Sequence, residues 1–217
     1  MQSIRWIDSL RTQTWACLTI IYLRYLLGGA YVYAGWGKAL GGRFMPQTPV
    51  TLLPGDPLSI GVFFEVLFRT GLWWQSLGAG QVLAGALLLT QRFAALGAVA
   101  YLPISVCIFL ITLSMAFHGT PVLTGLMLLG NLALLGWSYR QLSPLLLPNR
   151  NRSTTVVVDA DQLGRPGWWE GIGGLLLLTS LSFGNRTGPL LWGGLCLALG
   201  GVGLLGFWWL RRPLARR

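Results

Sequence analysis

Charge is scarce in this sequence, and acidic residues are the scarcest of all. Its 217 residues include six Asp and Glu against 16 Lys and Arg, and charged residues make up only 10% of the chain. A soluble globular domain carries about 25% charged residues, so this chain has too few to cover a water-facing surface. Hydrophobic residues make up 53%, and the mean hydropathy is +0.61. The composition predicts an integral protein of the lipid bilayer.

The ligands of common redox and metal centres are also missing. The single histidine, His118, cannot supply the two axial imidazoles of a b-type haem, nor a zinc site. The cysteines Cys17, Cys107 and Cys196 lie within apolar runs and form no CxxC pair, which argues against a thiol–disulfide relay. The GxSxG, GxGxxG and P-loop patterns are absent as well. The sequence therefore predicts no haem, metal or iron–sulfur site, and any electrons would have to come from a partner.

What the sequence does contain is a series of long apolar segments. A bilayer-spanning helix needs about 20 residues, and continuous apolar runs without period-two alternation indicate helices rather than strands. We expect six membrane helices at about residues 15–35, 74–90, 93–117, 121–137, 168–183 and 189–210. The fifth segment is short, so whether it spans the membrane is left open.

The basic residues predict how these helices are oriented. The net charge of +10 does not indicate a nucleic-acid partner, because the arginines form no single basic face. With both termini in the cytoplasm, the outer loops hold only Lys38, Arg43, Arg69 and Arg186, as the positive-inside rule requires. The inner side then holds Arg5, Arg11, Arg92, Arg140, Arg150, Arg152, Arg165, Arg211, Arg212, Arg216 and Arg217. We therefore expect an all-α polytopic membrane protein with both termini inside.

Three parts follow one another along the chain. Residues 1–139 are predicted to form a four-helix membrane bundle with a long outer loop at 38–73. Residues 140–167 are a cytoplasmic connector, in which "TTVVVDA" fits a short strand. Residues 168–217 form an appendix of two glycine-rich membrane helices, a composition that favours helix–helix contact.

The outer loop contains a helical segment of its own. After a stretch rich in turn formers, "LSIGVFFEVLFRTGLWW" is apolar except for Glu65 and Arg69. These two residues lie four apart, so on a helix they share a face and can pair. We expect an interfacial or re-entrant helix over the outer mouth of the bundle. A seventh span is the alternative, and it would break the parity that the arginines support.

The first helix carries a polar face between two cations. Arg24 lies about 14 Å into the bilayer at 1.5 Å per residue, where a guanidinium costs about 2.5 kcal/mol or more and normally faces a partner. Arg24, Gly28, Tyr31, Gly35 and Lys38 share this face by helical spacing. The candidate partners are Glu65, Gln81, Ser105, Thr112, Ser114 and Asn131. The face is either a site for an anionic or carbonyl-bearing ligand or a buried network that fixes helix packing.

Two stretches resemble the DoxX/DoxD-like membrane proteins. "LRYLLGGAYVYAGWGKAL" resembles the family's first-helix signature R-x3-G-x2-[FY]-x3-G-x2-K, and "GQVLAGALLLTQRFAALGA" resembles its second-helix block. The matching residues are Arg24, Gly28, Tyr31, Gly35 and Lys38, then Gly85, Arg92, Ala94 and Ala95. The resemblance covers residues 15–139, and Gln81 stands where the family often has an acid. It implies a four-helix membrane bundle near quinone chemistry, as in the DoxD subunit of thiosulfate:quinone oxidoreductase.

We therefore expect a membrane subunit of a redox-associated complex, in the plasma (inner) membrane of a bacterium or archaeon. It would bind a quinone near Arg24, with Trp73 among the stacking rings, and dock a partner that carries the redox cofactor. The predicted ligand-binding residues are Arg24, Tyr31, Lys38, Glu65, Trp74, Gln81, His118 and Asn131. His118, in an outer turn, is either a plain turn residue or a hydrogen-bond partner of the quinone. The alternatives are a scaffold subunit without a ligand site and a small-solute or lipid transporter; whether the chain is an enzyme is left open.

Overall fold

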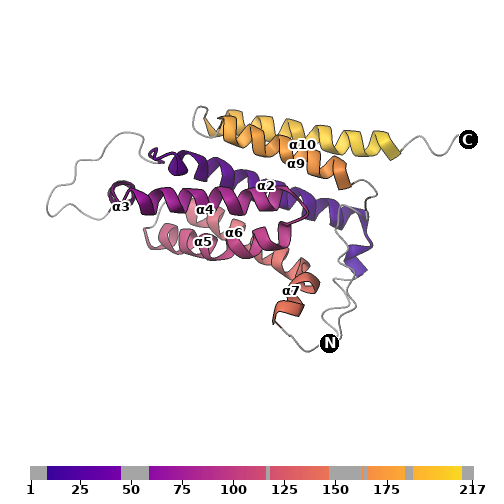
Figure 1. Cartoon of the computed structure of the whole chain (residues 1–217), viewed down its shortest axis with the longest axis horizontal. Helices are drawn as coiled ribbons and strands as arrows, with labels where there is room; N and C mark the ends of the chain where they lie inside the picture. Colours follow the sequence, from indigo (N-terminus) through magenta and orange to yellow (C-terminus); the bar gives the residue numbers. More distant parts are fainter. Residues whose placement is uncertain are drawn as a thin grey trace, which may run out of the picture.

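The regular structure of the described chain is helical. The computed structural model describes residues 9–44, 59–115, 118–146, 163, 166–183 and 188–211, and no strand occurs in these ranges. The helices are α2 (Thr14–Ala39), α3 (Ile60–Arg69), α4 (Leu72–Leu89), α5 (Ala94–Ser114), α6 (Thr120–Trp137), α7 (Tyr139–Leu146), α9 (Pro166–Phe183) and α10 (Pro189–Arg211). Figure 1 shows the long helices running side by side. The all-α prediction is confirmed for these residues.

Five of these helices are long and apolar enough to cross a membrane: α2, α4, α5, α6 and α10. The short helix α9 is not among them, so the sixth span and the placement of both termini inside remain predictions. Many large apolar side chains of the five helices point outward, including Leu83, Leu126 and Leu197. A surface of that kind suits contact with lipid chains rather than with water.

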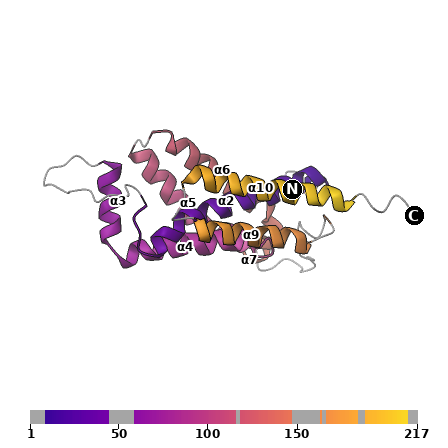
Figure 2. The same cartoon turned by 90° about the horizontal axis from the view of Figure 1, so that it is seen from above.

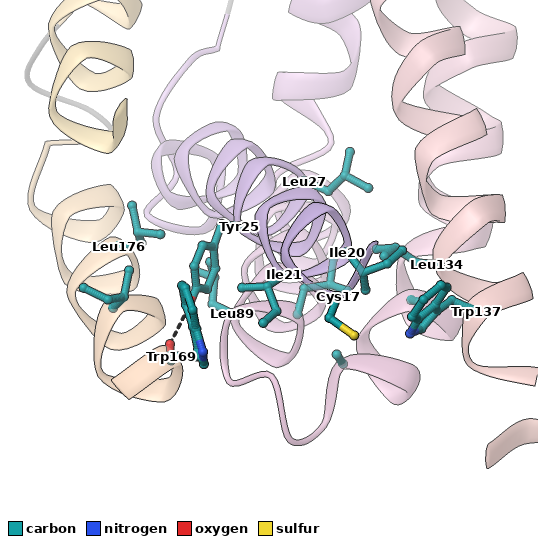
Figure 3. Packing of buried hydrophobic residues seen from close by; sticks show 14 of the residues in the cluster. Cys17, Ile20, Ile21, Tyr25, Leu27, Leu89, Leu134, Trp137, Trp169 and Leu176 are labelled. Atoms are coloured by element: carbon teal, nitrogen blue, oxygen red, sulfur yellow. Dashed lines mark hydrogen bonds between the residues drawn. The ribbon is translucent and has the colours of Figure 1, made fainter. Parts of the chain in front are cut away.

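Helix α2 is the centre of the structure. It contacts α4, α6 and α9, and Figure 1 shows α9 and α10 on one side of it, with α5 and α6 on the other. Figure 3 looks along α2 and shows Cys17 and Leu27 among the core side chains, with Leu176 of α9 to one side and Leu134 of α6 to the other. Packing on several sides explains why α2 buries a larger share of its residues than the other candidate spans.

Glycines allow α2 and α4 to meet at very short range. A Cβ atom on Gly28 would lie 2.8 Å from the carbonyl oxygen of Gly85, and one on Gly35 would lie 2.7 Å from the carbonyl oxygen of Gly78. Real Cβ atoms do not approach backbone oxygens so closely, so these positions require glycine. We call these four residues the glycine seam. The two α2 glycines belong to the face that carries Arg24 and Lys38, and α4 packs directly on that face.

The two C-terminal helices pack on this bundle through hydrogen bonds as well as apolar contacts. The Tyr25 hydroxyl on α2 donates to the carbonyl oxygen of Trp169 on α9 (Figure 3). The Tyr22 hydroxyl donates to the carbonyl oxygen of Gly200 on α10 at 2.6 Å. Trp192 of α10 then donates to the Ser180 hydroxyl of α9 at 3.1 Å. The appendix is therefore joined to α2 directly.

Two short helices differ from the long ones. Figure 2 shows α3 running across one end of the bundle rather than along the long helices, and its ten residues are not a candidate span. Helix α7 directly follows α6 and begins the predicted connector. No sequence pattern described above predicts α7. The expected "TTVVVDA" strand lies outside the described residues.

Candidate functional site

A cavity of about 260 Å³ lies in the end of the bundle that α3 crosses. Its walls come from α2, α3, α4, α5 and α6, together with Phe44 in the segment after α2. Most of its lining side chains are apolar. The cavity brings together four of the predicted ligand-binding residues: Tyr31, Lys38, Trp74 and Gln81.

Lys38 supplies a buried cation to this cavity. Its side chain is 5% exposed, and its Nζ donates to the carbonyl oxygen of Ala34 and to Oε1 of Gln81, both at 2.9 Å. Nζ also lies 4.1 Å from the ring centre of Phe44 and 5.6 Å from that of Trp74, in cation–π contact. No carboxylate of the described residues pairs with it. An ammonium has three N–H donors, so Lys38 keeps one donor for a ligand.

Aromatic rings and hydroxyls complete the lining. Trp74 is fixed by a 2.9 Å hydrogen bond from Nε1 to the carbonyl oxygen of Gly42. Tyr31 stacks on Tyr101 of α5, with ring centres 3.5 Å apart. On the opposite side, the hydroxyl oxygens of Thr112 and Thr124 lie 2.8 Å apart and join α5 to α6. The cavity is thus apolar with a cationic donor on its α2 side and hydroxyls on its α5–α6 side.

Glu65 is the single buried residue of α3. Its carboxylate accepts from Arg69 Nε at 3.0 Å, which confirms the predicted pair, and from Arg43 Nε at 3.2 Å. Hydrogen bonds from Arg43 and Arg69 hold the pKa of the Glu65 carboxyl below its ordinary value. The guanidinium of Arg43 also stacks over the ring of Phe68, 4.1 Å from its centre. Glu65 therefore ties α3 to the chain just beyond α2, and it does not line the cavity.

Arg24 lies apart from this cavity, contrary to the expectation of a ligand beside it. Its side chain is buried, and Nη1 donates to Oε1 of Gln91 at 3.1 Å. The glycine seam explains the separation, because α4 covers α2 between Arg24 and Lys38. Gln91 lies in the short turn between α4 and α5 and has a positive φ of 58°. Gln91 belongs to no sequence motif; its only signal is a polar residue in a turn between two apolar helices.

The remaining predicted site residues do not meet at the cavity. Asn131 is fully buried in α6 and donates from Nδ2 to the carbonyl oxygen of Ala98 on α5 at 3.2 Å. His118 is exposed just before α6. Trp73, expected to stack on a ring, is 64% exposed, whereas Trp74 is buried.

No protein-family model, curated protein or solved structure matches the chain. Within the described residues, no three His, Cys, Asp or Glu side chains gather as metal ligands would. The site must therefore be interpreted from its own geometry.

Proposed function

We propose that this chain is an integral membrane subunit that binds a quinone in the cavity beside Lys38. The observation that supports this proposal is the buried ammonium, which has a free donor and no carboxylate partner among the described residues. A cation inside a membrane helix is costly and usually functional. A neutral side chain would serve packing equally well, so the charge is best explained by a ligand that accepts its hydrogen bond.

The lining fits a quinone headgroup. Lys38 would donate to a carbonyl oxygen, and the rings of Tyr31 and Trp74 would bound the flat headgroup. The volume of about 260 Å³ suits one ring, whereas drug-sized ligands occupy roughly 300–1,000 Å³; a long tail would extend beyond the cavity. A bound quinone would supply two-electron redox chemistry, and the electrons would come from a docked partner that carries the redox cofactor.

The test is quinone binding by the full-length protein in mild detergent, followed by quenching of tryptophan fluorescence with a short-tailed quinone. We compare wild type with Lys38→Met, which keeps the length of the side chain. The matched control is Arg92→Gln, an exposed cation in the turn between α4 and α5. Loss of one hydrogen bond to a charged group should weaken binding about tenfold or more in Lys38→Met alone.

Two other results would count against the proposal. Equal quenching in all three proteins would mean that Lys38 does not hold the ligand. Absence of both co-purified quinone and quenching, with a protein partner that is always present, would favour the scaffold alternative. That alternative is supported by the joining of α9 and α10 to α2 through hydrogen bonds away from the cavity.

A further inference from the structure

Helix α3 forms part of the wall of the cavity. Phe64 and Leu67 of α3 line the cavity, as does Phe44. The Phe64 ring meets the rings of Phe44 and Trp74 edge to face, with centres 5.9 and 6.3 Å apart. These contacts place α3 directly over the side of the cavity that holds Lys38.

The attachment of α3 is unusual because a carboxylate anchors it. An amphipathic helix normally buries an apolar stripe, but every residue of α3 other than Glu65 is at least partly exposed. Arg69 belongs to α3 itself, so Arg43 is the partner that joins Glu65 to another part of the chain. The position of α3 thus depends on the charge-assisted Arg43–Glu65 contact, on the cation–π contact of Arg43 with Phe68, and on edge-to-face rings.

A hinge follows α3 immediately. Gly71 separates α3 from α4 and has a φ of +60°, and a Cβ there would meet no atom within 4 Å. The positive φ favours glycine, and no neighbouring atom packs against the position that its Cβ would take. Hinges of moving segments are typically a few residues of this kind at the ends of helices.

We propose that α3 is a hinged cap over the Lys38 cavity and that Glu65 is the positioning residue that holds it closed. The role of the cap, which would be to control entry of the ligand, rests on the proposed function. When Arg43 releases Glu65, α3 turns about Gly71 and carries Phe64 and Leu67 away from the cavity. Glu65 itself touches no ligand.

The test measures access to the cavity without any quinone. A reporter thiol is placed in the cavity wall by Met127→Cys, with Cys107→Ser and Cys196→Ser to remove the two accessible cysteines. Buried Cys17, in the part of α2 farthest from the cavity, is kept as an internal control for unfolding. The full-length protein in nanodiscs is treated with a water-soluble maleimide, and mass spectrometry follows each site.

Glu65→Gln and Arg43→Gln should each label the reporter about tenfold faster, because both lose the charge-assisted contact while the edge-to-face rings remain. Arg43→Gln also loses the cation–π contact with Phe68, so Glu65→Gln is the cleaner of the two variants. Glu65→Asp should label the reporter almost as slowly as the protein with Glu65 intact, because the carboxylate is kept. Glu170→Gln, which changes an exposed acid on α9, should leave the labelling rate unchanged. Cys17 should stay unlabelled throughout.

Equal reporter rates in all variants would overturn the proposal, as would labelling of Cys17 together with the reporter, since Glu65 would then act only on global stability. Adding a short-tailed quinone separates this inference from the proposed function. Protection of the reporter supports both. Fast labelling in Glu65→Gln without protection by quinone would support the cap and contradict the proposed quinone site.

Discussion

Two buried cations on α2 are satisfied in different ways. Lys38 contacts an amide oxygen, a backbone carbonyl and two aromatic rings beside a cavity. Arg24 is bonded to Gln91 in a turn at the other end of α4. We infer that Arg24 fixes the packing of α2 against α4, whereas Lys38 is available to a ligand.

The Arg24–Gln91 contact can be tested by mutation. Gln91→Leu should lower the free energy of unfolding by about 1.5–3 kcal/mol, the usual range for a hydrogen bond to a charged group. Gln75→Leu, an exposed glutamine on α4, is the matched control and should have little effect. Reversible unfolding in mixed micelles measures both. Similar values for the two variants would show that Arg24 does not depend on Gln91.

The contribution of Glu65 to stability should depend on pH. Because Arg43 and Arg69 hold the pKa of Glu65 below its ordinary value of 4.5 in the folded protein, its contribution is complete above that value. It is lost as the pH falls through the lowered pKa. The thermal midpoint of wild type should therefore exceed that of Glu65→Gln at neutral pH, and the two should converge in acid. Arginine stays charged throughout, so a difference that does not shrink as the pH falls below the ordinary pKa of 4.5 would contradict the assignment.

At the scale of elements, the glycine seam sets the distance between α2 and α4. A helical Gly→Ala change normally stabilises by about 0.5–1 kcal/mol. Gly85→Ala should instead destabilise by about 1–3 kcal/mol, because its Cβ would lie 2.5 Å from the carbonyl oxygen of Gly28. Gly174→Ala on α9, where a Cβ meets nothing within 4 Å, should be neutral or stabilising. Unfolding measurements that rank the two variants in the opposite order would argue against the seam.

The positions of the helices were more predictable from the sequence than the side-chain contacts between them. Long apolar runs define the membrane helices to within a few residues, although α2 continues to Ala39. The Glu65–Arg69 pair follows from local helical spacing. Arg43 and Gln91 could not be found in this way, because their contacts join segments 22 and 67 residues apart. The cavity likewise draws on five helices, and only the three-dimensional packing separates its members from Arg24 and Asn131.

At the scale of the whole molecule, burial decreases from the central helix to the cap. Helix α2 is enclosed by α4, α6 and α9, whereas α3 buries only Glu65. Backbone amides of α3 should therefore exchange with deuterium long before those of α2 in nanodiscs, since local opening is easiest where few groups are buried. Exchange followed by mass spectrometry measures this order. Comparable protection of the two helices would contradict it.

The central position of α2 also has a consequence for biosynthesis. Helix α2 leaves the ribosome before α4, α6 and α9, the helices that pack around it. Gln81 follows Lys38 by 43 residues, and Gln91 follows Arg24 by 67. At about 5–20 residues per second, the longer wait is roughly 3 to 13 s. During those seconds Lys38 and Arg24 lack the side-chain amides that later bind them. We therefore expect the nascent α2 to stay in contact with the insertion machinery until α4 emerges.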